Sequence, residues 1–155
     1  MSKKVFESEG TLVLKALLDV NVLIALHDRE HVHHAHVVNW LQGHQHAGWA
    51  SCPLTQNGCL RIMSQPGYSN PQPMAALVHM LRQSTRAPAH TWLPDDISLL
   101  DEKHLHAQLM HSPAQLTDLY LLALAVKHSA RLVTLDRRIP LNAVVHATPA
   151  HLIVL

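Results

Sequence analysis

Short apolar runs with strand character alternate with longer segments of helical character along most of this chain. The residues from Leu12 to Leu18 are apolar on both faces except at Lys15, as is typical of a central strand in a parallel sheet. Further strands are expected at residues 48–51, 91–93, 131–135 and 151–155. Because strands that alternate with helices form sheets covered on both faces, the pattern predicts a three-layer α/β/α sandwich with a mostly parallel central sheet.

Helical segments are expected between these strands. Asn21 has the side chain of a helix cap and is expected to begin a short helix over residues 22–26. Pro53 stands where proline commonly starts a helix. Residues 65–73 are rich in proline, glycine and asparagine and are expected to form a loop. The remaining helices are predicted at residues 31–43, 53–63, 74–83, 95–104 and 116–128.

Length and composition favour one folded domain. The chain has 155 residues, of which 48% are hydrophobic and 15% charged, so it can bury a core and is not expected to be disordered. Residues 1–11 are polar and are expected to be a disordered or frayed N-terminus, which leaves residues 12–155 as a single domain. The formal net charge of +1 gives no strong global field for a polyanion. No segment reaches membrane-spanning length, so a soluble cytoplasmic protein is expected.

The cysteines and histidines do not form a recognisable metal motif. Cys52 and Cys59 are the only two cysteines, which is neither a disulfide framework nor a zinc motif, so reduced and buried thiols are expected. Four histidines fall in the helix expected over residues 31–43, and their spacing brings pairs of them onto one face: His31, His33, His34 and His36. Because no cysteine or carboxylate cluster completes a shell, a structural or adventitious role is favoured over a zinc or nickel site.

Three aspartates stand where apolar segments end or begin. Asp19 follows the first expected strand, Asp136 follows the strand at 131–135, and Asp118 opens the apolar helix at 116–128. An unpaired carboxylate beside apolar surface is costly, and sites in open parallel sheets form beyond the carboxyl ends of the strands. If the strand order brings these ends together, the carboxylates suit Mg²⁺, which favours phosphodiester chemistry.

Each aspartate also has an ordinary structural interpretation. Asp118 can be a helix cap, and Asp136, which precedes two arginines, can be a turn residue. Asp19 is harder to explain in this way, because it directly follows an apolar strand and Asn21 lies close by. The chemistry of the residues alone leaves the metal site and the structural roles both open.

Three blocks of sequence resemble one known family. The segments Leu17–Leu26, Leu116–Ala125 and Leu132–Asp136 are similar to the acidic motifs of PIN-domain ribonucleases, and within that superfamily to VapC-type toxins of bacterial toxin–antitoxin pairs. The resemblance runs in the right order from about Leu14 to Ile139 and is specific as an ensemble. Supporting blocks are His31–Trp40, Trp49–Thr55 and Leu60–Ile62.

The resemblance implies a magnesium- or manganese-dependent endoribonuclease that cleaves single-stranded or looped RNA, commonly tRNA or rRNA, in a single PIN-like nuclease domain over residues 12–155. Asp19 and Asp118 would be the principal metal ligands, with Asp136 as a further ligand or a supporting group. Asn21 and Thr117 would orient carboxylates and water through hydrogen bonds. Family members usually form homodimers, and a small cognate antitoxin binds in the active-site groove.

One position departs from the family pattern. The second acidic position, normally a glutamate on the helix after the second strand, is occupied here by Asn57. An amide oxygen can bind Mg²⁺ or its water but brings no charge, so a second metal is expected to bind more weakly. Asn57 can equally be an ordinary helix residue.

Basic and aromatic residues offer candidate RNA contacts. Arg61, Arg137 and Arg138 are the best candidates for binding phosphate, since guanidinium pairs with phosphate through two hydrogen bonds. Each can equally be a structural partner of the nearby acids. Trp49 and Trp92 are expected in the core, because both fall in strand-like runs.

Other functions that use an aspartate after the first strand fit less well. A phosphoacceptor receiver domain needs an acidic pair there and a late lysine, and a phosphatase of the haloacid dehalogenase type needs Asp-x-Asp. This chain has Asp19-Val20-Asn21. A catalytically weakened PIN-fold module that binds RNA or a partner remains the alternative, with Asn57 as its support.

Overall fold

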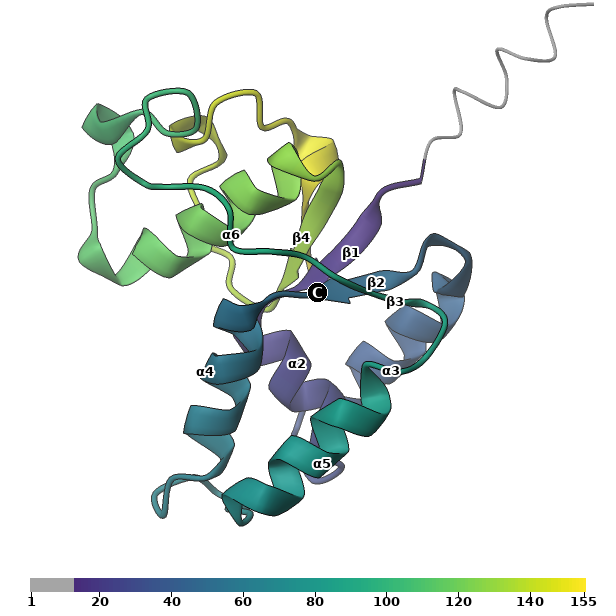
Figure 1. Cartoon of the computed structure of the whole chain (residues 1–155). Helices are drawn as coiled ribbons and strands as arrows, with labels where there is room; N and C mark the ends of the chain where they lie inside the picture. The colour runs from purple at the N-terminus through teal and green to yellow at the C-terminus, as the bar shows by residue number, and fades with distance from the viewer. Residues whose placement is uncertain (1–12) are drawn as a thin grey trace, which may run out of the picture.

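The structure is a computed structural model that describes residues 13–155 of the chain (Figure 1). Its centre is a five-stranded, entirely parallel sheet in the order β3-β2-β1-β4-β5. The strands are β1 Lys15–Leu18, β2 Trp49–Ser51, β3 His90–Trp92, β4 Ala130–Thr134 and β5 Leu152–Val154. The mostly parallel sheet predicted from sequence is therefore confirmed. The N-terminus expected to be frayed, residues 1–11, lies outside the described residues.

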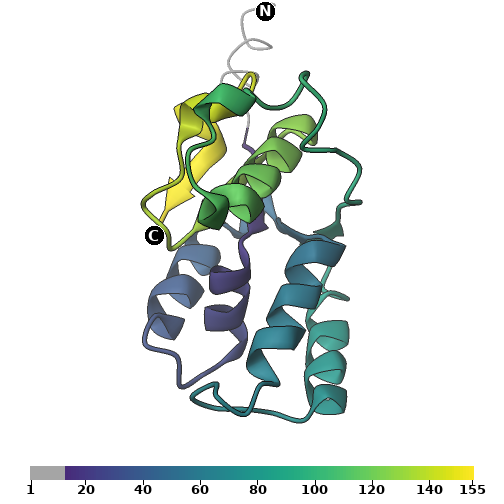
Figure 2. The ribbon, with the colours of Figure 1, turned by 90° about the vertical axis from the view of Figure 1, so that its left-hand side faces the viewer.

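Helices cover both faces of the sheet, which confirms the three-layer arrangement. Figure 2 shows α6 above the sheet and the other four helices below it. The helices are α2 Val20–His27, α3 His34–Gly43, α4 Pro53–Met63, α5 Met74–Ser84 and α6 Leu116–Lys127. None of the helices in residues 13–155 has the length and apolar character needed to cross a bilayer.

Each face of the sheet carries its own hydrophobic core. Leu17 of β1 and Leu132 of β4 pack toward α6, while Leu18 and Val133, their neighbours in the same strands, pack toward α2 to α5. This alternation is the two-residue period of a strand. Each leucine buried in this way contributes roughly 1.5–3 kcal/mol relative to an exposed one. The two cores hold the central strands β1 and β4 rigidly, and the candidate site lies at their ends.

A glycine lets α4 pack closely against α2. A Cβ atom at Gly58 would lie 2.8 Å from Cγ2 of Val20, which is closer than carbon atoms normally approach. Val20 begins α2 directly after Asp19. Gly58 therefore allows α4 to approach the start of α2, beside the first aspartate.

The N-cap of α2 differs from the prediction. The helix begins at Val20, and its cap is Asp19, whose backbone is extended and whose side chain accepts a hydrogen bond from the Val20 N–H. Asn21 lies inside the first turn, so its prediction as the cap was wrong. Aspartate and asparagine cap helices about equally well, and the sequence pattern could not choose between them.

The helix predicted at residues 95–104 is absent, and the segment consists of loop and turns. Its polar side chains bind backbone groups in ways that compete with a helix. Asp95 accepts a hydrogen bond from the distant N–H of Leu54, and Ser98 and Asp101 each accept one from a backbone N–H two residues on. The segment instead crosses from β3 toward the face of the sheet that α6 covers.

Two smaller corrections concern α3 and β3. The helix expected from residue 31 begins at His34, because His31 closes a turn with Asp28 and its ring accepts the N–H of His33. Trp92 was predicted to be buried, but its side chain is 54% exposed. The reason is that β3 is an edge strand, which no further strand covers on its outer side.

The loop predicted over residues 65–73 is confirmed and is fixed by a buried carboxylate. Asp28, which is 3% exposed, accepts hydrogen bonds from the Tyr68 hydroxyl and the Asn70 amide. These bonds hold the pKa of Asp28 below its usual value, although burial alone would raise it. The loop between α4 and α5 is thereby tied to the end of α2.

Candidate active site

The site forms at the carboxyl ends of β1 and β4, the two neighbouring central strands. Leu18 of β1 pairs with Val133 of β4, and the Asp19 N–H continues the ladder by donating to the Val133 carbonyl at 2.9 Å. Asp136 follows two residues after the end of β4. The parallel arrangement therefore brings Asp19 and the Asp136 segment to the same edge of the sheet, as the sequence predicted.

Asp19 is a buried carboxylate with two fixed hydrogen bonds. Asp19 is only 3% exposed. Oδ1 accepts the Val20 N–H at 2.7 Å, and Oδ2 accepts the Thr134 hydroxyl at 2.7 Å. Burial raises the pKa of Asp19; the two hydrogen bonds oppose that effect, and the charge of Asp136 adds to it. The ionised form of Asp19 is thus costly unless a cation compensates it.

Thr134 links the polar groups at this edge, and the sequence analysis missed it. Its fully buried hydroxyl donates to Asp19 and accepts the Asp136 N–H at 3.0 Å and an Nδ2–H of Asn21 at 3.5 Å. Asn21 Oδ1 also accepts the N–H of Leu135 at 3.2 Å. Asn21 therefore acts on Asp19 through Thr134. A hydroxyl at the end of an apolar strand, two residues before Asp136, was the available signal.

Asp118 lies in the first turn of α6 and shares an electrostatic environment with the other two aspartates. Its pKa is raised to about 7, first by burial and then by the negative charges of Asp19 and Asp136, while Arg138 opposes the shift. The cap of α6 is Gln115, so the interpretation of Asp118 as a helix cap was wrong. Its first-turn position still favours a negative charge through the helix dipole.

Asp136 makes a turn with Arg138. Its Oδ1 accepts the Arg138 N–H at 2.9 Å and the Arg138 Nε–H at 3.3 Å. These bonds, with the backbone one first, hold the pKa of Asp136 below its usual value. The turn interpretation of Asp136 is therefore confirmed, while its charge also acts on Asp19 and Asp118. Arg138 is 84% exposed, so this ion pair adds little to stability.

The donor chemistry fits a hard divalent cation, but the three carboxylates do not form a ready-made shell. Among residues 13–155, no group of three histidine, cysteine, aspartate or glutamate side chains is close enough to hold a metal together. Magnesium needs only one or two carboxylates and keeps several waters. Asp19 and Asp118, both with raised pKa values and both affected by Asp136, are the pair whose charge a cation would relieve.

The remaining predicted site residues are exposed. Asn57 and Arg61 are on the same side of α4 and line one groove that continues past the end of the helix to Gln65. Thr117 is exposed at the start of α6, and Arg137 is exposed beside Arg138. The roles of these residues in binding RNA or water stay predictions.

The histidines near α3 bind backbone groups. His34 donates through Nδ1–H to the carbonyl of Ala25, and the His31 ring accepts the N–H of His33. These contacts join α3 to α2 and shape the turn before α3. They give two of the histidines structural roles of the kind favoured from sequence.

Comparison with known proteins agrees with this architecture. Residues 16–144 match the family model described as PIN domain, and the chain belongs to this family. The chain is 48% identical over 139 residues to Ribonuclease VapC44 of Mycobacterium tuberculosis, a match that covers 90% of this chain and 98% of the relative. It is 37% identical over 124 residues to Ribonuclease VapC39 of the same organism, with 79% and 89% covered. Ribonuclease VapC38 is 38% identical over 122 residues, with 78% and 84% covered. The resemblance to VapC-type PIN proteins is confirmed.

Proposed function

We propose that this protein is a metal-dependent endoribonuclease that hydrolyses phosphodiester bonds of RNA and acts as the toxin of a toxin–antitoxin pair. The observation that carries the proposal is the set of mutually repelling carboxylates at the carboxyl edge of the sheet, in which Asp118 has a pKa of about 7. The relatives named as ribonucleases of the VapC type support the same activity.

Asp19 and Asp118 would hold Mg²⁺ or Mn²⁺, with Asp136 close by as a further ligand or a supporting charge. The bound ion would lower the pKa of a water and neutralise charge on the scissile phosphate. Thr134 fixes the rotamer of Asp19 through its hydroxyl, and Asn21 fixes Thr134. Such hydrogen bonds behind metal ligands commonly change metal affinity by about 10–100-fold.

RNA contacts would come from exposed groups around this edge. Arg137 and Arg138 follow Asp136 directly, and Arg61 is exposed on α4 near Asn57. Their guanidinium groups can bind phosphates on either side of the scissile bond. Thr117, in the first turn of α6, can orient a water molecule.

The proposed partners follow from the family. They are an RNA substrate, with tRNA or rRNA as the expected class, a small cognate antitoxin and a second copy of the chain in a homodimer. The expected setting is the cytoplasm.

A catalytically weakened module that binds RNA or a partner is the second candidate. Asn57 favours it, because an uncharged amide stands where the family carries a glutamate. The two candidates differ in one outcome: the endoribonuclease cleaves RNA, and the weakened module binds RNA or a partner without cleaving it.

Purified protein incubated with total tRNA and Mg²⁺ tests the proposal. We expect fragments with 5′-phosphate ends, no cleavage in EDTA, and at least a hundredfold loss of rate in Asp19→Asn. Glu102→Gln, which removes an exposed carboxylate elsewhere, is the matched control and should cleave at the wild-type rate. RNA that binds without being cut would favour the weakened module, and cleavage by Asp19→Asn at the wild-type rate would exclude the proposed mechanism.

A further inference from the structure

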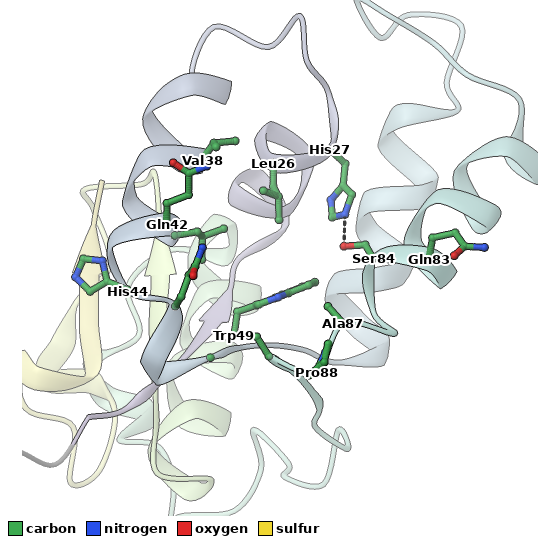
Figure 3. A pocket seen from close by; sticks show the side chains of 14 residues that line it. Leu26, His27, Val38, Gln42, His44, Trp49, Gln83, Ser84, Ala87 and Pro88 are labelled. Atoms are coloured by element: carbon green, nitrogen blue, oxygen red, sulfur yellow. Dashed lines mark hydrogen bonds between the residues drawn. The ribbon is translucent and has the colours of Figure 1, made fainter.

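A cavity of about 700 Å³ lies at the opposite edge of the sheet from the aspartates (Figure 3). Its floor includes Gly48 and Ala89, the residues that directly precede β2 and β3. Asp19 follows the end of β1, and all strands are parallel. The cavity is therefore separate from the candidate active site, and its occupant is not the scissile RNA bond.

The walls of the cavity are largely apolar. Leu26 of α2, Val38 and Leu41 of α3 and Pro88 line the cavity. The indole of Trp49 extends into it between Leu26 and Pro88 in Figure 3. An indole gives a large, rigid apolar surface with one hydrogen-bond donor. Cavities of about 300–1,000 Å³ with mostly apolar walls and few polar groups are the usual form of small-molecule sites.

The lining carries no acidic or strongly basic side chain. None of the 14 lining residues is aspartate, glutamate, lysine or arginine. A charged ligand would lose its hydration here without gaining a partner of opposite charge. The composition of the lining therefore disfavours nucleotides, phosphates and metal ions as occupants.

The histidine that lines the cavity between α2 and α5 is also neutral. His27 donates through Nδ1–H to the Leu23 carbonyl at 2.8 Å, so Nε2 accepts from the Ser84 hydroxyl at 2.8 Å. Burial lowers the pKa of His27, which keeps the ring uncharged at neutral pH. The other polar side chains of the lining are Gln42, His44, Gln45 and Gln83, and the Ser84 oxygen keeps its lone pairs as acceptors.

From these features we infer that the cavity is a binding site for a neutral, largely apolar small molecule with an aromatic or alicyclic body and a hydrogen-bonding end group. The body would stack on Trp49, and the end group would pair with a polar side chain at one side of the cavity, Gln42 on α3 or Gln83 on α5 (Figure 3). This inference does not depend on the nuclease activity.

Two probes of the same shape and different charge test the inference on the full chain. The neutral probe is 2-naphthamide, and the charged probe is 2-naphthoate. Binding is followed by NMR at the indole N–H of Trp49, which is assigned by its disappearance in Trp49→Phe. We expect 2-naphthamide to shift this signal in a saturable way and 2-naphthoate to bind at least tenfold more weakly.

Variants locate the binding. Ala87→Phe places a ring at the cavity wall and should weaken 2-naphthamide at least tenfold, whereas Ala75→Phe, at the other end of α5 from Ser84, should leave it unchanged. Gln42→Lys, an exposed change at the rim, should reduce or reverse the preference for the neutral probe. The inference is overturned if neither probe moves the Trp49 signal, if the anion binds as tightly as the amide, or if Ala87→Phe and Ala75→Phe behave alike.

Discussion

Replacing Thr134 with valine isolates the hydrogen bonds that orient the aspartates, because valine keeps the branched shape and removes only the hydroxyl. That hydroxyl is fully buried, donates to Asp19 at 2.7 Å and accepts the Asp136 N–H at 3.0 Å. A hydrogen bond to a charged group contributes about 1.5–3 kcal/mol and a neutral one about 1 kcal/mol. Thr134→Val should therefore destabilise the protein by about 3 kcal/mol, which corresponds to a Tm lower by about 6–12 °C in a chain of this size.

The same substitution should weaken the metal site. The Thr134 hydroxyl lowers the pKa of Asp19, so its loss raises that pKa further and favours the protonated carboxyl. Mn²⁺ affinity should fall by about 10–100-fold, and the rise of cleavage rate with pH should move to higher pH. Calorimetry gives the Tm and the Mn²⁺ affinity. A pH–rate profile with tRNA gives the change in the pH at which the cleavage rate rises.

Thr134→Ser is the matched control, because it keeps the hydroxyl and removes only the methyl group. It should recover the Mn²⁺ affinity and the pH profile of the wild type, with a smaller loss of Tm from the cavity it leaves. A valine variant with wild-type Mn²⁺ affinity and an unchanged pH profile would show that Thr134 does not position Asp19.

Three further predictions concern pH, the position of the missing glutamate and the loop after α4. The pKa of Asp118 rises from 3.8 to about 7 on folding, so the folded state binds this proton more tightly. In the metal-free protein the contribution of Asp118 to the free energy of unfolding should fall by about 1–2 kcal/mol, after allowance for its partial exposure, as pH rises through that interval. Urea unfolding of the wild type and Asp118→Asn in EDTA at pH 4 and pH 8 measures this contribution, which is the amount by which stability changes less favourably with pH in the wild type than in the variant. Asn57→Glu should lower the Mg²⁺ concentration for half-maximal cleavage severalfold while Asn57→Gln does not, and equal Mg²⁺ requirements in a titration would place this residue outside the metal site. Tyr68→Phe removes the hydroxyl that donates to Asp28 and should cost about 1–2 kcal/mol of stability in urea. Its Mn²⁺ affinity by calorimetry should stay at the wild-type value, and a fall would mean that this loop reaches the site.

The parallel sheet was predictable from sequence because each strand is a short apolar run between helical segments. Parallel strands end at the same edge, so the proximity of Asp19 and the Asp136 segment also followed from the order of elements. The sequence alone did not place Asp118 with the other two aspartates, because an acidic residue in the first turn of a helix is usually explained by the helix dipole. Only the effects of Asp19 and Asp136 on its pKa show that it belongs with them.

What the sequence did not predict depends on contacts between distant residues. The hydroxyl of Thr134 joins β4 to β1 and α2, and its position at a strand end does not tell which distant residues it binds. The helix expected at residues 95–104 is absent because Asp95 binds the start of α4, more than forty residues earlier in the chain. Trp92 is exposed because β3 lies at the edge of the sheet. The periodicity within one strand cannot reveal its place in the sheet.

Anomalous diffraction from a crystal soaked in Mn²⁺ shows whether Asp19 and Asp118 bind the ion. We expect one strong anomalous peak bound by oxygens of Asp19 and Asp118, which disappears in Asp118→Asn. A peak only at the histidines before and within α3, or no peak at saturating Mn²⁺, would contradict the proposal that these carboxylates hold the catalytic ion.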